Sequence, residues 1–205
     1  MMRRKRINSR GKNKKVWRWG ILHEFYVAYT QNLLYTLLWI YFRIFLNAGE
    51  KMAVQVVLVE PEIPQNTGNI ARTCVVTGSV LHIVGPMGFS LDEKHVRRAG
   101  LDYWKDLTLY TYNSLNELYQ KYPEGDFWYF SSKVEKNFDR ADYSADCFLV
   151  FGKETAGLPK ELLQKNGERS VRIPMQKGQR CLNLSNAVCV GVYEALRQNG
   201  YFHMM

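Results

Sequence analysis

Three polar, glycine-containing segments of the chain combine residue types that suit ligand binding. Residues 61–72 read PEIPQNTGNIAR, residues 151–159 read FGKETAGLP, and residues 173–186 read IPMQKGQRCLNLSN. Backbone amides at a helix start and an arginine on its first turns suit a phosphate or a ribose. Glycines let the backbone approach a ligand closely. The first segment therefore predicts a contact to a phosphate or a ribose, and the two glycines of the second predict a close approach of the backbone to a ligand.

Several other chemistries lack the residue patterns they need. Gly152 and Lys153 are neighbours, but the G-x-x-x-x-G-K-[ST] order of a nucleotide-binding loop is absent, and no G-x-G-x-x-G occurs. The chain has no G-x-S-x-G elbow, and its four histidines have no partner at a suggestive spacing, which disfavours hydrolase chemistry. The four cysteines form no C-x-x-C pair, so we expect no metal site and a reduced, cytoplasmic compartment.

Strand-like and helix-like segments alternate between residues 54 and 198. Apolar runs rich in β-branched and aromatic residues predict strands, whereas capping residues, apolar stripes and stop signals predict helices. The predicted strands are residues 54–59, 80–84, 107–112, 127–130, 147–151 and 171–174. The predicted helices are residues 66–77, 90–100, 114–122, 158–165 and 185–198. This alternation favours an α/β fold, a mostly parallel sheet with helices on both faces.

The expected sheet also indicates where a ligand would bind. In open α/β sheets ligands bind beyond the carboxyl ends of the strands, and the three polar segments follow predicted strands. Asn66 and Thr67 are expected to cap the helix that begins in the first segment, and Gly78 is expected to end it. The loops after the strands are therefore the expected ligand sites.

The formal charge of +9 is concentrated in residues 1–51. This stretch holds 11 basic and 2 acidic side chains, which leaves 17 of the 28 basic and 17 of the 19 acidic side chains in residues 52–205. Residues 52–205 are therefore neutral overall. Any affinity of that part for RNA has to come from local clusters of charge.

Residues 1–51 differ in character from the rest of the chain. A basic stretch precedes an apolar run at residues 33–46, an order that resembles a membrane segment. The run is shorter than the roughly 20 residues of a spanning helix, and Arg43 interrupts it. We expect residues 1–51 to be an extension outside a single folded domain at residues 52–205, with Met52 as the natural start. A membrane anchor is the disfavoured alternative.

The three segments, in this order and spacing, resemble the motifs of SPOUT methyltransferases. The residues that carry the resemblance are NTGNIAR at 66–72, FGKETAGLP at 151–159 and NLSNA at 183–187. The similarity is strongest to the small single-domain type that methylates the 2′-hydroxyl of the wobble cytidine or uridine of tRNA, and it covers residues 54 to about 202. It implies a C-terminal trefoil knot, S-adenosylmethionine as methyl donor, tRNA as partner, and a homodimer.

The resemblance also assigns roles to individual residues. The residues expected to line S-adenosylmethionine are Phe130, Gly152, Ile173, Cys181 and Leu182. Arg72 is the candidate catalytic residue, because a guanidinium near the 2′-oxygen or an adjacent phosphate would stabilise negative charge there. The alternative for Arg72 is a surface arginine in an ion pair. Glu154 stands beside Lys153, where we expect only a local pair and no catalytic role.

A further set of residues is expected to contact RNA. These residues are Asn66, Lys94, Arg97, Arg98, Lys177, Arg180, Asn183, Ser185 and Tyr193. The three basic residues between 94 and 98 would share one helix face, and complementing the helix dipole is their alternative role. For Asn183 and Ser185, the alternative to RNA contact is ordinary helix capping. For Tyr193, the alternative is a place in the core or in a dimer interface.

Two positions depart from the motifs, and two other activities remain open. Position 181 is Cys where Ser is common, and position 156 is Ala where Arg is frequent. The second departure bears on the RNA substrate more than on the chemistry. The alternatives are 2′-O-methylation of another RNA, such as ribosomal RNA, and an RNA-binding module of the same fold that has lost catalysis.

Overall fold

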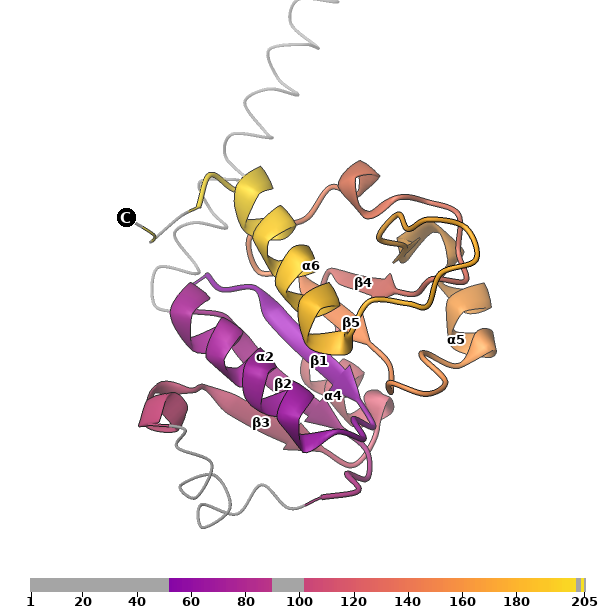
Figure 1. The fold of residues 1–205 in the computed structure, drawn as a ribbon. Coiled ribbons are helices and arrows are strands. Elements are labelled where there is room, and N and C mark those ends of the chain that lie inside the picture. Colours follow the sequence, from indigo (N-terminus) through magenta and orange to yellow (C-terminus); the bar gives the residue numbers. More distant parts are fainter. Residues whose placement is uncertain (1–51, 90–101, 202–203, 205) are drawn as a thin grey trace, which may run out of the picture. The chain divides into compact units, whose positions relative to one another are not determined.

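The computed structural model describes residues 52–89, 102–201 and 204, and in them the strands form one parallel sheet. The order is β3-β2-β1-β5-β4-β6, and every neighbouring pair is parallel (Figure 1). The strands are β1 (Gln55–Val59), β2 (Val80–Val84), β3 (Leu109–Tyr112), β4 (Phe127–Phe130), β5 (Phe148–Phe151) and β6 (Ser170–Val171). The predicted mostly parallel sheet is confirmed.

Helices cover both faces of this sheet, as predicted. The helices are α2 (Pro64–Thr77), α4 (Leu115–Lys121), α5 (Lys160–Lys165) and α6 (Leu184–Gln198), with short 3-10 turns at Asp102–Asp106, Phe138–Arg140 and Gly167–Arg169. Val56 and Leu58 of β1 belong to a core that includes α2 and α6, whereas Val57 and Val59 belong to a second core under α4 and α5. Alternate side chains of a strand point to opposite faces, so α2 and α6 lie on one face and α4 and α5 on the other.

The beginning of α2 differs from the prediction. The helix begins at Pro64, Ile63 is its N-cap residue, and Ile63 offers no side-chain hydrogen bond. Asn66 and Thr67, predicted as caps, are buried inside the first turns. Proline suits the first helical position because it has no N–H to leave unpaired. The predicted end is confirmed, since Gly78 has a φ of 68° and its N–H bonds to carbonyls of the last turn.

The strand predicted at 171–174 is shorter, because β6 spans Ser170–Val171 and continues only as an isolated bridge between Arg172 and Asn137. Pro174 has no N–H to donate to a strand ladder, which limits the strand on that side. The helix predicted at residues 90–100 lies outside the described residues.

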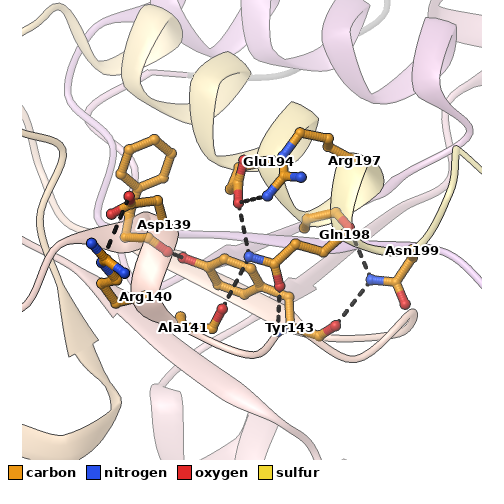
Figure 2. A network of polar contacts seen from close by, with 10 residues as sticks. Asp139, Arg140, Ala141, Tyr143, Glu194, Arg197, Gln198 and Asn199 are labelled. Atoms are coloured by element: carbon orange, nitrogen blue, oxygen red, sulfur yellow. Dashed lines mark hydrogen bonds and ion pairs between the residues drawn. The ribbon is translucent and has the colours of Figure 1, made fainter.

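The C-terminal end of α6 is held by a polar network (Figure 2). The Gln198 amide donates to the Ala141 carbonyl (3.0 Å) and to the Glu194 carboxylate (2.8 Å), and its oxygen accepts from the Tyr143 N–H (3.1 Å). The Asn199 amide donates to the Tyr143 carbonyl (2.9 Å). Two side chains thus pair the end of α6 with the backbone of the segment between β4 and β5. This anchoring fixes the direction of α6, whose other end leads into the third polar segment.

The described residues contain no helix that is long and apolar enough to cross a membrane.

Candidate active site

The three polar segments meet at one edge of the sheet. Because all strands are parallel, their carboxyl ends share this edge, and the segments follow β1, β5 and β6. β1 and β5 are direct neighbours, with Leu58 opposite Phe151 at the edge. The first and second segments are therefore adjacent in space although about ninety residues separate them in sequence.

Glu154 connects the second segment to the beginning of α2. Its carboxylate accepts hydrogen bonds from the backbone N–H groups of Glu62 (2.9 Å) and Ile63 (3.3 Å) and from the Asn66 side-chain amide (2.9 Å). The carboxylate thus binds the two residues that lead into α2, and negative charge is favourable at a helix start. The prediction that Glu154 forms only a local pair with Lys153 is wrong. Strand pairing brings it to a helix start far away in the sequence.

Two further pairs tie the same loops together. The Lys153 ammonium donates to the Glu60 carboxylate at 2.7 Å, and this contact raises the pKa of Lys153. The Thr155 hydroxyl (2.7 Å) and the Thr155 N–H (3.0 Å) both donate to the Glu62 carboxylate. These hydrogen bonds lower the pKa of Glu62, because they favour its charged form. Glu60 and Glu62 thus both bind donors of the second segment.

Asn66 and Asn183 join the first segment to the third. The Asn183 amide donates to the Asn66 side-chain oxygen at 2.9 Å, while Asn183 Oδ1 accepts from the N–H (2.9 Å) and the hydroxyl (2.6 Å) of Ser185. Asn183 is therefore the N-cap of α6, which confirms the capping role considered for it. Together with the Glu154 contact, these bonds form a continuous chain of polar contacts through all three segments.

Glycine is required at two positions of the second segment for different structural reasons. A Cβ at Gly152 would lie 2.2 Å from the Gly157 carbonyl carbon and 2.3 Å from Leu158 N, so the loop folds back tightly on Gly152. Gly157 instead has a φ of 69°, which residues other than glycine rarely adopt, and the space around it is open. We expected these glycines to let the backbone approach a ligand. At Gly152, the close approach is made by the loop itself.

The residues predicted to line the methyl donor lie at neighbouring strand ends and in one loop. Phe130 and Gly152 are at or directly after the ends of β4 and β5, and Ile173 follows β6. The Phe130 ring is buried and stacks on Phe151, with ring centroids 4.6 Å apart. Leu182, in contrast, is 42% exposed. The structure therefore brings Phe130, Gly152 and Ile173 to adjacent strands.

The loop at residues 174–183 has the properties of a ligand-binding surface. Every residue in it is exposed, including the apolar Met175 and Leu182. Its internal backbone hydrogen bond in the described structure is from Gln179 N to Gln176 O, at 3.3 Å. Most of its backbone donors and acceptors are thus available to a ligand that has an apolar body and polar edges. An adenine-containing donor such as S-adenosylmethionine fits this set of groups.

Comparison with known proteins identifies the family of the chain. The model of the SpoU rRNA Methylase family matches residues 53–193. This chain belongs to the SpoU family. A relative from Saccharophagus degradans, named tRNA (cytidine(34)-2′-O)-methyltransferase, is 44% identical over 147 residues, which are 71% of this chain and 96% of that protein.

Solved structures agree with the SpoU assignment. One that concerns the 2-OH methylation of C/U34 on tRNA has 38% sequence identity and a TM-score of 0.68, and the match covers 73% of this chain and 97% of that one. The AdoMet-bound rRNA methyltransferase from Sinorhizobium meliloti has 25% identity and a TM-score of 0.62, and the match covers 72% of this chain and 57% of that one. The predicted SPOUT fold is confirmed. The trefoil knot stays a prediction.

The remaining predicted site residues of this SpoU protein fall into two groups. Arg72 lies on α2, the same helix as Asn66, and its side chain is exposed. Lys177 and Arg180 are exposed in the loop at residues 174–183. Tyr193 is 40% exposed on α6, so its place in the core is excluded. Three more predicted RNA contacts, Lys94, Arg97 and Arg98, lie outside the described residues.

Sequence reasoning missed one segment of the SpoU site, residues 131–133. The Ser131 N–H donates to the Val171 carbonyl (2.9 Å), and the Cys181 thiol lies 3.3 Å from the Ser132 hydroxyl. The Lys133 ammonium donates to the Ala156 carbonyl at 2.9 Å. This short segment, directly after β4, therefore touches β6 and two of the polar loops. In the sequence, this segment could have been identified as part of the site only by its position after a predicted strand. Its residues, two serines and a lysine, match no motif.

Proposed function

We propose that this SpoU-family protein transfers a methyl group from S-adenosylmethionine to the ribose 2′-hydroxyl of the wobble nucleotide, position 34, of tRNA. The observation that carries the proposal is the contact chain Glu154–Asn66–Asn183, which joins all three motifs at one sheet edge. The relative named tRNA (cytidine(34)-2′-O)-methyltransferase supports the substrate, since it aligns over almost its full length.

The residues at this edge suit the donor. S-adenosylmethionine supplies a methyl group on a positively charged sulfur. The exposed backbone of residues 174–183 offers hydrogen bonds to an adenine, and Leu182 offers an apolar contact to its ring. Phe130, Gly152 and Ile173 set the floor of the site at three adjacent strand ends. Cys181 contributes through its backbone, so the change from the commoner Ser is tolerated.

Arg72 is the proposed catalytic residue. A ribose hydroxyl is a poor nucleophile at neutral pH, so its oxygen has to be held in line with the methyl group and stabilised as its proton leaves. The guanidinium is always charged, and its forked donors suit an oxyanion or a neighbouring phosphate. The Arg72 side chain is exposed, on a helix whose beginning is fixed by Glu154. We infer that this fixed helix holds the guanidinium beside the 2′-oxygen.

The enzyme is further proposed to be a cytoplasmic homodimer. Val76 of α2 is 61% exposed, and Val190 and Tyr193 of α6 are 38% and 40% exposed. α2 and α6 pack side by side, so these apolar side chains lie on two neighbouring helices (Figure 1). A second copy would remove them from water. Sedimentation equilibrium tests this proposal, and a monomer at micromolar concentration would contradict it. Four free cysteines agree with a reducing compartment.

Residues 52–205 are proposed to be the complete catalytic unit, with residues 1–51 outside it. The family match supports this division, because it begins at residue 53. A chain that starts at Met52 should therefore be soluble and as active as the full chain. An insoluble or inactive product would show that residues 1–51 take part in folding or catalysis.

Labelling of RNA tests the proposed reaction directly. The full chain is incubated with methyl-labelled S-adenosylmethionine and either bulk tRNA or ribosomal RNA, and the labelled nucleosides are mapped. We expect label on the ribose of nucleotide 34 of tRNA. Label in ribosomal RNA alone would support the alternative substrate, label on a base would refute the 2′-O chemistry, and no label in either RNA would favour an RNA-binding module without catalysis.

A further inference from the structure

Lys133 places a positive charge at the rim of the site, and in the described part of the chain it forms no ion pair with a carboxylate. Its ammonium donates to the Ala156 carbonyl at 2.9 Å, and the side chain is exposed. An ammonium has three donors, so this bond uses one of them. A neutral carbonyl does not cancel the charge. Lys153, in the same region, is different because it forms an ion pair with Glu60 at 2.7 Å.

Three acidic side chains in and beside the first and second motifs are bound to other groups. Glu60 pairs with Lys153, Glu62 accepts from Thr155, and Glu154 accepts from the beginning of α2. Glu135, two residues after Lys133, forms no ion pair with it in the described part of the chain. Among the described residues, no carboxylate therefore forms an ion pair with Lys133 that an incoming anion would have to displace.

Lys133 lies close in sequence to a contact with the proposed S-adenosylmethionine loop and itself contacts the second motif. It follows β4 directly after Ser132, whose hydroxyl lies 3.3 Å from the thiol of Cys181 in the loop at residues 174–183. Its own partner, Ala156, belongs to the second motif. Lys133 thus belongs to a segment that contacts both the loop proposed to hold the donor and the second motif, and its ammonium is held by the Ala156 carbonyl. A charge held in place before binding loses less side-chain freedom when a ligand arrives.

We propose that Lys133 binds a phosphate of the tRNA strand beside the methylated nucleotide, and that its bond to Ala156 holds the ammonium in position. This inference rests on the proposed tRNA methylation and adds a contact that the three motifs do not contain. A lysine ammonium is a compact point charge with rotatable donors, and it suits a phosphate oxygen.

The salt dependence of tRNA binding separates this role from a structural one. Each phosphate contact to single-stranded RNA contributes about 0.7 to the slope of log affinity against log salt. We expect Lys133→Met to reduce the slope for tRNA by about that amount and to weaken binding about tenfold at low salt. KM for tRNA rises, whereas the affinity for S-adenosylmethionine, measured by calorimetry, stays within twofold.

Matched variants make the test specific. Lys133→Arg keeps the charge and should restore most of the slope, and Lys133→Gln keeps an amide donor without charge and should behave like Lys133→Met. Lys165 is an exposed lysine at the end of α5, so Lys165→Met is the control and should leave the slope unchanged.

Three results would overturn the inference. They are an unchanged slope in Lys133→Met, rescue by Lys133→Gln, and an equal loss of slope in Lys165→Met. A weaker affinity for S-adenosylmethionine with an unchanged slope would show that Lys133 only fastens the Ala156 loop. Failure of the proposed function looks different, because the wild-type chain itself would then leave tRNA unlabelled.

Discussion

Replacing Glu154 by alanine tests whether its carboxylate holds the beginning of α2. The carboxylate accepts from the N–H groups of Glu62 (2.9 Å) and Ile63 (3.3 Å) and from the Asn66 amide (2.9 Å). A negative charge at a helix start contributes about 0.3 to 1 kcal/mol, and a hydrogen bond to a charged group contributes about 1.5 to 3 kcal/mol. Glu62 and Ile63 are exposed, so water replaces part of what is lost. We expect the free energy of unfolding to fall by about 2 kcal/mol.

Urea unfolding followed by circular dichroism measures this change. A loss of about 2 kcal/mol corresponds to a fall in Tm of about 4 to 8 °C for a domain of roughly 150 residues. Glu154→Gln keeps one oxygen acceptor and should lose about half as much. Glu124 is exposed in the turn after α4, so Glu124→Ala serves as the control and should stay within about 0.5 kcal/mol of the wild type.

A double-mutant cycle extends the test to the contact chain. Glu154 and Asn183 both bind the Asn66 side chain, so Glu154→Ala and Asn183→Ala should not be additive. The expected coupling energy is about 0.5 kcal/mol or more. The reasoning is refuted if Glu154→Ala unfolds at the wild-type urea concentration, or if the two substitutions add within error. Either result would mean that the three motifs are held together by packing alone.

Three other predictions concern single positions. Arg72→Ala should abolish methyl transfer, while calorimetry should still detect S-adenosylmethionine binding. Arg72→Lys should recover only part of the activity. Wild-type turnover in Arg72→Ala would exclude the catalytic role. Gly152→Ala should prevent soluble expression, because the added Cβ would lie 2.2 Å from the Gly157 carbonyl carbon. Gly157→Ala should still fold, and its free energy of unfolding should fall by about 1 kcal/mol, because the backbone φ of 69° is strained for alanine. The pKa of His82 is lowered from 6.5 to about 4, mainly because the ring is buried and to a smaller extent because Lys121 is positively charged. Between these values the unfolded chain binds a proton that the folded protein does not, so stability should fall by about 3 kcal/mol as the pH drops from 6.5 to 4. Urea unfolding at both pH values should show this fall in the wild type, and His82→Phe should lack that part of it.

The sequence was sufficient to predict the sheet because of how parallel strands are buried. A strand covered on both faces needs apolar residues at consecutive positions, and β1, β4 and β5 all have such runs. The helix between β1 and β2 was predicted too, and its left-handed stop at Gly78 was correct. These features depend on local residue patterns, so one chain read in order is enough to find them.

Contacts between distant segments could not be predicted in the same way. Asn66 and Thr67 have the residue types of a helix cap, and the pattern alone placed the helix start there. The structure instead begins α2 at Pro64, and the residues that lead into it are bound by Glu154, about ninety residues later. That contact exists because β1 and β5 are neighbours in the sheet, and no local pattern contains the order of the strands. Lys133 was missed for the same reason, since its partner Ala156 is known only once β4 and β5 pair.

The distribution of paired charges explains how a neutral domain can present a basic site. Residues 52–205 hold equal numbers of acidic and basic side chains, which gives no overall attraction for RNA. At the site, however, Glu60, Glu62 and Glu154 all face protein donors, and the exposed loop at residues 174–183 contains basic residues and no acidic one. Lys133 adds a cation that, within the described residues, is hydrogen-bonded to a carbonyl and to no carboxylate. A phosphate backbone responds to charges within about one Debye length, roughly 8 to 10 Å, so the local excess decides binding more than the total does. Glu62 and Glu154, which help to assemble the motifs, are thus bound to backbone and neutral side-chain donors and do not neutralise Lys133, Lys177 or Arg180.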